Sequence, residues 1–363
     1  MNTFFLDRLN SEPHALAFAG QSTPWPVALA DQSANPALDE ALHTHAAAAQ
    51  ALLYPVSAEL LATTGRPVDL FGFEPNLARL GAAAAASASV PGIALTQLGA
   101  LLDAAALGYN PAQAKPVAVL GHSQGVLAVH MVQAICEAGS IDAAAAKIDE
   151  ILAIATLIGV AGTRQARQLG LAARHGEATP MLSVKDITRA QVDALIERVD
   201  GARGPIAVAV TNSATHYVLS GYPEDLAAFG VEVAKEHKRQ AKLREEKVRG
   251  GRVFGPTLEY LDVTLPFHSP LMADAVSQAV AWAEACGINA DHARELAAEV
   301  LLNHVDWAAR VRALMKSTDP SAVGAGLRSG QHRRQTVLHR GPGHRRRRGG
   351  SLHRGRSRRA LHA

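Results

Sequence analysis

The chain has 363 residues, of which 48% are hydrophobic, 19% charged and 4% aromatic, enough apolar material for one large domain or two smaller ones. Two cysteines are too few for a disulfide framework, which favours a cytoplasmic location. No apolar run reaches the ~18 residues of a membrane helix. The N-terminus lacks a signal-peptide pattern. The net charge of +3 is uneven, because residues 326–363 hold twelve Arg, five His and no acidic residue, which leaves 24 Lys and Arg against 33 Asp and Glu in the rest.

The first half of the chain alternates short apolar runs with longer helical patterns. LAFAG and KPVAVL predict two buried strands. Apolar residues at helical spacing occur in four stretches: about residues 27–53, residues 91–110, the segment after Ser123 with Leu127, Met131 and Ile135, and about residues 142–168. Strands that alternate with helices indicate an α/β fold with a parallel sheet.

The pattern changes after Pro180. MLSV, DITRAQVDALIERV, PIAVAVTN, HYVLSG and the stretch from PEDLAAFG onward predict strand, helix, strand, strand and helix, and LEYLDVTL supplies a closing strand. This order is typical of a ferredoxin-like unit. We therefore expect an α/β-hydrolase-like large subdomain over residues 1–178 and 263–325, with a ferredoxin-like subdomain inserted over 179–262. Two further helices are expected over residues 270–285 and 291–302.

Residues 326–363 lose apolar periodicity and consist largely of Arg, Gly and His. Three interpretations remain open: a nucleic-acid-binding tail, a disordered tail, and the product of a reading-frame shift in GC-rich DNA. The frame shift is favoured, because out-of-frame GC-rich codons encode mostly Arg, Gly, Pro, Ala and His.

The motif GHSQG at residues 121–125 lies between a predicted strand and a predicted helix. A Gly-x-Ser-x-Gly in that position is typical of a nucleophile elbow, a sharp turn that needs small neighbours and exposes the serine oxygen. Backbone N–H groups at the start of the helix can then hold an oxyanion. We predict that Ser123 is a nucleophile.

A serine nucleophile needs a general base. His268 in VTLPFHSPLM follows a predicted strand and is the candidate. His122 and His130 flank the elbow, but helix geometry turns them elsewhere, so neither is expected to be the base.

Four segments, FAGQST, GHSQG, NSATHYVLSG and TLPFHSPLM, resemble in order and spacing the malonyl/acetyl-CoA:acyl-carrier-protein transacylases. The resemblance covers about residues 14–325. It is nearest to the acetyltransferase domain of actinobacterial type I fatty acid synthase, because GHSQG replaces the usual GHSLG and LIGV follows.

The resemblance implies a Ser–His dyad without an Asp, no metal and no cofactor. Ser123 would be acylated and His268 would act as base and acid. The remaining roles that it implies are an oxyanion hole from the backbone N–H groups of Gln21 and Gln124, substrate contacts from Gln97, Ile158 and His122, and orientation of the His268 ring by the Asn303 carbonyl.

The acyl group is predicted from one position at which this sequence differs from the malonyl-specific members of the family. Malonyl-specific members of the family carry an Arg before a Gly in the helix after the elbow, whereas TLIGV here places Ile158 before Gly159. An apolar side chain suits an acetyl group and leaves the malonyl carboxylate unpaired. Arg164, six residues on, faces a different direction and is not expected to substitute.

The predicted function is transfer of an acetyl group from acetyl-CoA, through acyl-serine, to the phosphopantetheine thiol of an acyl carrier protein, the priming step of fatty acid synthesis. Expected partners are the carrier domain, coenzyme A thioesters and other fatty acid synthase domains, with no membrane and no nucleic acid. The alternatives are a serine esterase of α/β-hydrolase type and an inactive truncated fragment of the synthase.

The basic stretch 235–252 is either a solvated helix face or a docking surface for an acidic carrier or coenzyme A phosphates.

Overall fold

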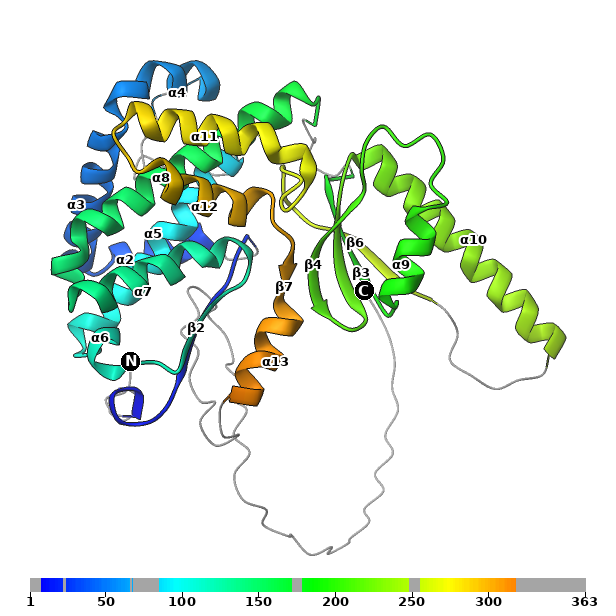
Figure 1. Cartoon of the computed structure of the whole chain (residues 1–363), viewed down its shortest axis with the longest axis horizontal. Helices are drawn as coiled ribbons and strands as arrows, with labels where there is room; N and C mark the ends of the chain where they lie inside the picture. Colours follow the sequence, from blue (N-terminus) through cyan, green and yellow to red (C-terminus); the bar gives the residue numbers. More distant parts are fainter. Residues whose placement is uncertain are drawn as a thin grey trace, which may run out of the picture. The chain divides into compact units, whose positions relative to one another are not determined.

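The fold is given by a computed structural model (Figure 1). The structure describes residues 8–21, 24–65, 67, 85–171, 178–247 and 255–317. All of them belong to the first of two units, residues 1–331 and 332–363. The predictions for the basic tail, residues 326–363, lie outside the described residues.

The first part of the chain forms two short parallel strands surrounded by helices. Its elements are β1 (Ala15–Phe18), α2 (Trp25–Ser33), α3 (Pro36–Leu52), the 3-10 turn η1 (Tyr54–Val56), α4 (Ser57–Thr64), α5 (Ala85–Ala106), α6 (Pro111–Ala114), β2 (Ala118–Gly121), the 3-10 turn η4 (Ser123–Gly125), α7 (Val126–Ala138) and α8 (Ile141–Gln168). Strands β1 and β2 pair in parallel from Ala15↔Ala118 to Phe18↔Gly121. In the part of the chain that the structure describes, these two strands make up the parallel sheet expected for the large subdomain.

The second part of the chain builds a mixed sheet and returns to the helical body. Its elements are β3 (Met181–Lys185), α9 (Arg189–Ile196), β4 (Ala207–Ser213), β5 (His216–Ser220), α10 (Pro223–Lys247), β6 (Thr257–Tyr260), the 3-10 turn η5 (Pro270–Met272), α11 (Ala273–Ala285), α12 (Ala290–Leu301), β7 (Val305–Asp306) and α13 (Trp307–Ser317).

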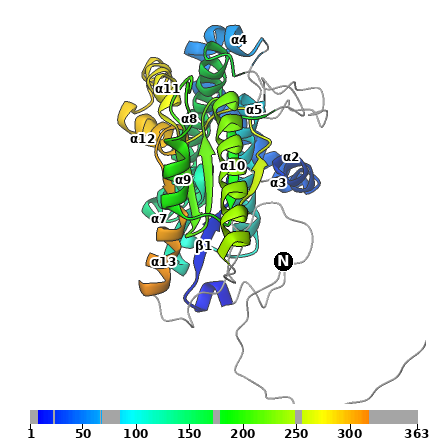
Figure 2. The same ribbon diagram turned by 90° about the vertical axis from the view of Figure 1, so that its right-hand side faces the viewer.

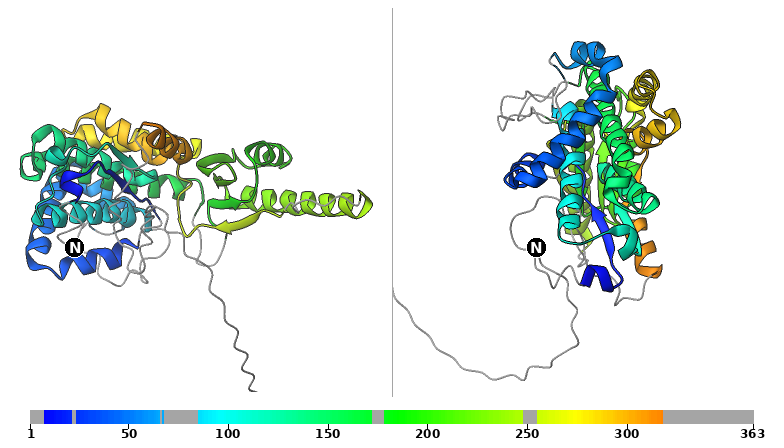
Figure 3. Two further views of the ribbon diagram at one scale, coloured as in Figure 1. Left: turned by 90° about the horizontal axis from the view of Figure 1, so that it is seen from below. Right: turned by 90° about the vertical axis from the view of Figure 1, so that its left-hand side faces the viewer.

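Helix α8 is the centre of the helical body. It packs against α3, α5, α7, α11 and α12 (Figure 1, Figure 3), and every residue from Ile151 to Thr163 is buried. Gly159 permits the close contact with α5, because a Cβ there would lie 2.7 Å from the carbonyl oxygen of Ala86. The apolar length of α8 is therefore explained by helices on several sides.

Helix α5 is the one described helix that is long and apolar enough to cross a membrane, over Ala86–Ala106. Of that window, 72% is buried inside the fold, against α8 and α2 among others. The composition of α5 is thus accounted for by core packing.

The small sheet has the strand order β6-β3-β5-β4-β7. Its first four strands are antiparallel, and with α9 and α10 they give the β-α-β-β-α-β order expected from the sequence. Both helices lie on the same face of the sheet (Figure 2) and share a separate apolar cluster that includes Leu182, Leu219 and Phe229. Strand β7 pairs in parallel with β4 and comes from outside residues 179–262, so the inserted segment does not build this sheet alone.

Three local predictions differ from the structure. The helix expected over residues 27–53 is two helices, because Asn35 caps α3 through a 3.2 Å bond from the Ala37 N–H and Pro36 begins the new helix. Helix α5 starts at Ala85 and carries Pro91 inside it. Strand β7 and helix α13 were not predicted.

Candidate active site

The turn after β2 has the geometry of a nucleophile elbow. Ser123 has φ +53°, a left-handed conformation that is costly for a residue with a side chain. Gly121 and Gly125 have no room for a Cβ, which would collide with Val126 N and with Phe18 O respectively. The small flanking residues thus allow the strained turn, and the N-terminal end of the helix that follows provides a positive electrostatic environment for the serine oxygen.

His268 lies directly beside the elbow serine, 145 residues away in sequence. Its Nε2 is 2.7 Å from Oγ of Ser123, and its Nδ1 is 2.8 Å from the carbonyl oxygen of Asn303. A carbonyl oxygen only accepts, so Nδ1 carries the proton and the lone pair of Nε2 faces the hydroxyl. The serine O–H therefore donates to a base whose tautomer is set by a peptide group.

The surroundings of His268 favour its neutral form. Burial of the side chain is the main cause that lowers the pKa of His268 to about 4. The hydrogen bond to Asn303 opposes this shift, and electrostatic repulsion from His122, His304 and Arg310 adds to it. His268 is therefore unprotonated at neutral pH, which is the state that a general base requires.

The loop after β1 covers the elbow. A Cβ on Gly20 would lie 2.8 Å from the carbonyl oxygen of His122, 3.0 Å from Cβ of Ser123 and 3.3 Å from the backbone nitrogen of Gln124. Only a glycine permits this close approach. The loop places Gln21 next to the elbow, where its Nε2 donates to Oε1 of Gln124 over 2.8 Å.

Gln97 reaches the same loop from α5. Its side chain is fully buried, and its Nε2 donates to the carbonyl oxygen of Ala19 over 2.7 Å. Its Oε1 is buried without a hydrogen-bond partner among the described residues. Of the predicted site residues, the structure thus gathers Ser123, His268, the Asn303 carbonyl, Gln21, Gln124 and Gln97 around the elbow.

Ile158 is fully buried in α8, and its aliphatic side chain has no hydrogen-bonding group that could join this network. Its neighbour Gly159 packs against α5 near Val90, whose carbonyl oxygen accepts from Gln124 Nε2. Arg164 is engaged elsewhere: its Nη1 donates to Oε1 of Gln278 over 2.8 Å.

His122 turns toward the small sheet. Its Nε2 is 2.9 Å from Oδ1 of Asn212 on β4, and its ring meets Trp307 of α13 edge-on with centroids 5.2 Å apart. Burial is the main cause that lowers the pKa of His122. Arg310 of α13 donates from Nη1 to the carbonyl oxygen of Gly121 over 2.8 Å.

Asn212, Trp307 and Arg310 were missed as residues that hold the elbow. Asn212 stands inside the segment NSATHYVLSG, which carried part of the resemblance, but its side-chain contact had no signal in the sequence. Trp307 and Arg310 belong to α13, an element that was not predicted.

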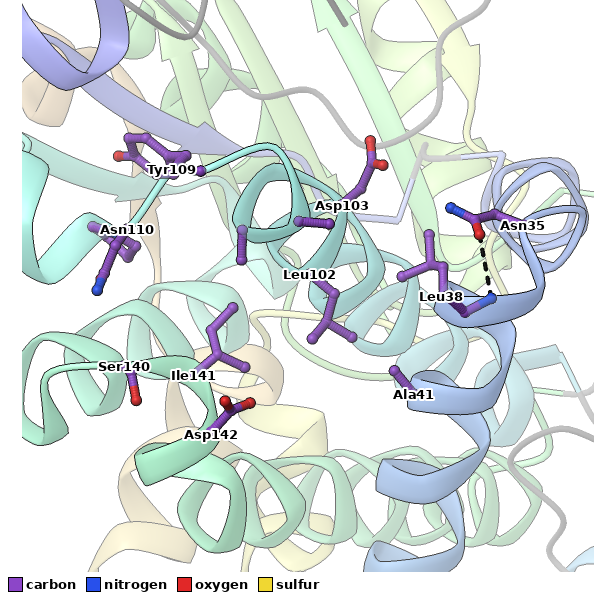
Figure 4. A pocket seen from close by; sticks show the side chains of 15 residues that line it. Asn35, Leu38, Ala41, Leu102, Asp103, Tyr109, Asn110, Ser140, Ile141 and Asp142 are labelled. Atoms are coloured by element: carbon purple, nitrogen blue, oxygen red, sulfur yellow. Dashed lines mark hydrogen bonds between the residues drawn. The ribbon is translucent and has the colours of Figure 1, made fainter.

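A cavity of about 440 Å³ lies elsewhere, between the start of α3, the end of α5, α6 and the start of α8 (Figure 4). Leu38, Leu102, Tyr109 and Ile141 are among its lining residues, and no predicted site residue is. Within the described ranges, no group of three His, Cys, Asp or Glu side chains is arranged to hold a metal ion.

Known proteins resemble this chain along its sequence. The family model of the fatty acid synthase central AT domain matches residues 180–260. Fatty acid synthase subunit beta of Schizosaccharomyces pombe is 27% identical over 209 residues, which is 52% of this chain and 10% of that protein. Fatty acid synthase 2 of Mycosarcoma maydis is 30% identical over 175 residues, 45% of this chain and 5% of that protein. Over these segments the chain is similar to fatty acid synthases and to their central AT domain. The family predicted from the motifs is thereby confirmed, and the chain spans a tenth or less of these relatives' length.

Solved structures of similar fold include malonyl-CoA transacylases. The malonyl CoA-acyl carrier protein transacylase of Coxiella burnetii is 16% identical with a TM-score of 0.54, over 88% of this chain and 87% of that chain. A malonyl-transacylase in complex with its type II polyketide synthase acyl-carrier protein is 18% identical with a TM-score of 0.51, over 88% and 89%. These likenesses confirm the predicted fold class.

Proposed function

We propose that this chain transfers an acyl group from a coenzyme A thioester, through Ser123, to the phosphopantetheine thiol of an acyl carrier protein in fatty acid synthesis. The observation that carries the proposal is the 2.7 Å contact between Ser123 Oγ and His268 Nε2, with Nδ1 held by the Asn303 carbonyl. The family relationship and the transacylase fold support the reaction class, and the complex of a similar transacylase with its carrier protein supports the partner.

In the first half-reaction, Nε2 of His268 takes the hydroxyl proton as Ser123 Oγ attacks the thioester carbonyl. Negative charge develops on the carbonyl oxygen, and the backbone N–H groups of Gln21 and Gln124 are the proposed donors to it. The C–S bond then breaks, and His268 returns the proton to the coenzyme A thiolate that leaves.

In the second half-reaction, the carrier thiol gives its proton to Nε2 of His268 and its sulfur attacks the acyl-serine ester. The same oxyanion site is used, the ester C–O bond breaks and Ser123 regains its proton. No cofactor enters this scheme, since coenzyme A is a substrate.

We propose acetyl as the preferred acyl group, which makes the reaction a priming step. The buried, uncharged Ile158 supports this choice, because its own side chain offers no charge to pair with a malonyl carboxylate. Other fatty acid synthase domains and a cytoplasmic location belong to the same proposal.

The test is covalent labelling with radiolabelled acetyl-CoA. We expect wild-type protein to take up label, S123A to take up none, and H268A to be labelled about 10³-fold more slowly, because base and nucleophile act as a unit. The control variant S57A, which changes an exposed serine on α4, should be labelled like wild type.

Three outcomes would contradict the proposal. Label that persists on S123A would remove Ser123 from the site. Fast hydrolysis of acetyl-CoA without transfer to a carrier thiol would favour the esterase alternative. A folded wild-type protein that takes up no label from any acyl-CoA would favour the inactive-fragment alternative.

A further inference from the structure

The side chains of Gln21 and Gln124 belong to one hydrogen-bond network that ends on helix α5. Gln124 is fully buried; its Oε1 accepts from Gln21 over 2.8 Å, and its Nε2 donates to the Val90 carbonyl oxygen over 2.5 Å. Gln21 Nε2 also donates to Oγ of Ser89 over 3.2 Å. The loop after β1, the elbow and α5 are therefore joined by two amide groups.

The same two residues are the proposed backbone donors to the oxyanion. The loop approaches the elbow closely, since a Cβ on Gly20 would lie 3.3 Å from the Gln124 nitrogen. The loop and the elbow lie about one hundred residues apart in sequence, and the side-chain bond between Gln21 and Gln124 links their positions directly. An oxyanion site is effective only when its donors are already in place before charge develops.

We infer that the Gln21–Gln124–Val90 network, here called the amide bridge, is a positioning device that holds the two oxyanion donors at a set separation. The inference rests on the proposed nucleophile. Gln21 and Gln124 act here through their side chains on the placement of their own N–H groups, in addition to the backbone role proposed above.

A fluorophosphonate probe tests the amide bridge without an acyl-CoA. Ser123 Oγ attacks phosphorus, the P–F bond breaks, fluoride leaves and the serine proton passes to His268 Nε2. The phosphoryl oxygen then occupies the oxyanion site, so the labelling rate reports on that site.

We expect Q124L and Q21L each to lower the maximal labelling rate about tenfold to a hundredfold, with little change in the probe concentration for half-maximal rate. The double variant should lose about as much as either single variant, because both remove the same bridge. Q21L changes a half-buried loop residue, so it keeps the test valid if Q124L does not fold.

Gln32 offers a matched control. Its Nε2 also donates to a backbone carbonyl of α5, that of Thr96 over 2.9 Å, but within the described residues its side chain makes no hydrogen bond to the loop or to the elbow. Q32L should therefore lower the unfolding temperature by an amount similar to Q124L while its labelling rate stays at the wild-type value.

The inference is overturned if Q21L and Q124L are labelled like wild type, if their losses multiply in the double variant, or if Q32L slows labelling equally. Wild-type Ser123 that does not react with the probe also overturns it. Reaction with the probe but not with any acyl-CoA would remove the proposed function and leave the amide bridge standing.

Discussion

His268 has a left-handed backbone conformation, φ +57°, and a buried side chain. Both nitrogens of its imidazole ring have hydrogen-bond partners. Burial is the main reason that its pKa falls to about 4, and the Asn303 carbonyl offsets part of that effect. The dyad needs no carboxylate to select the reactive tautomer, because a peptide carbonyl already does so.

The lowered pKa of His268 predicts the pH dependence of acylation. Its neutral form is the base, so the rate of Ser123 labelling should be flat from pH 8 to about pH 5 and fall only near pH 4, well below the ordinary histidine value of about 6.5. Pre-steady-state labelling at each pH measures this, with circular dichroism to show that the fold persists. A midpoint near 6.5 would contradict a buried, neutral base.

The lowered pKa of His268 should also make the free energy of unfolding depend on pH. Because the unfolded chain binds a proton on His268 at higher pH than the folded chain does, this residue lowers stability as the pH falls from about 6.5 to about 4, by at most ~3 kcal/mol. Loss of labelling near pH 4 must therefore be separated from unfolding by measuring both on the same samples.

Ile158 gives a prediction about substrate choice. Burial of an unpaired carboxylate costs several kcal/mol, and even ~3 kcal/mol is roughly a hundredfold in rate. Wild type should prefer acetyl-CoA to malonyl-CoA by about that factor, and I158R should raise malonyl transfer and depress acetyl transfer. The measurement is kcat/KM for both thioesters, with I158L as the matched apolar control. Equal use of the two thioesters by wild type would mean that another residue meets the carboxylate.

At the scale of elements, most of the fold could be predicted from the sequence. Helices α7 and α8 and strands β3 to β5 carry long or regular apolar patterns, and the Gly-x-Ser-x-Gly turn has a known backbone form. Strand β7 could not be predicted, because Val305 and Asp306 become a strand only by pairing with β4. A two-residue segment carries no periodicity of its own.

In the candidate site, too, some residues could be predicted from the sequence and others could not. Ser123 was predicted from its local turn and His268 from its place after a predicted strand, whereas the roles of Gln97 and Asn303 depended on the family resemblance, since no local pattern joins residues so far apart. The bond from Arg310 to the Gly121 carbonyl has no sequence signal at all, because its acceptor is a backbone group. Contacts of side chains with distant peptide groups are therefore what the structure adds.

At the scale of the whole molecule, charge separates the acidic body from the basic tail. The site residues lie between Gln21 and Arg310, and their described contacts lie within residues 8–317. Truncation after Ala325 removes twelve Arg and five His, and we expect the rate of Ser123 acylation and the KM for the carrier to stay within about twofold of wild type. The measurement compares both chains at low and high salt. A higher KM for the carrier in the truncated chain, lost at high salt, would assign the tail a binding role.

The pairing of β7 with β4 has a mechanical consequence. Asn303, whose carbonyl holds the proton of His268, stands two residues before β7, and His304 is hydrogen-bonded to Thr211 of β4 over 3.0 Å. A hinge movement that displaced the small sheet would pull on the peptide that sets the histidine tautomer. The pairing of these two strands therefore helps to hold in place the peptide carbonyl that sets the tautomer of His268.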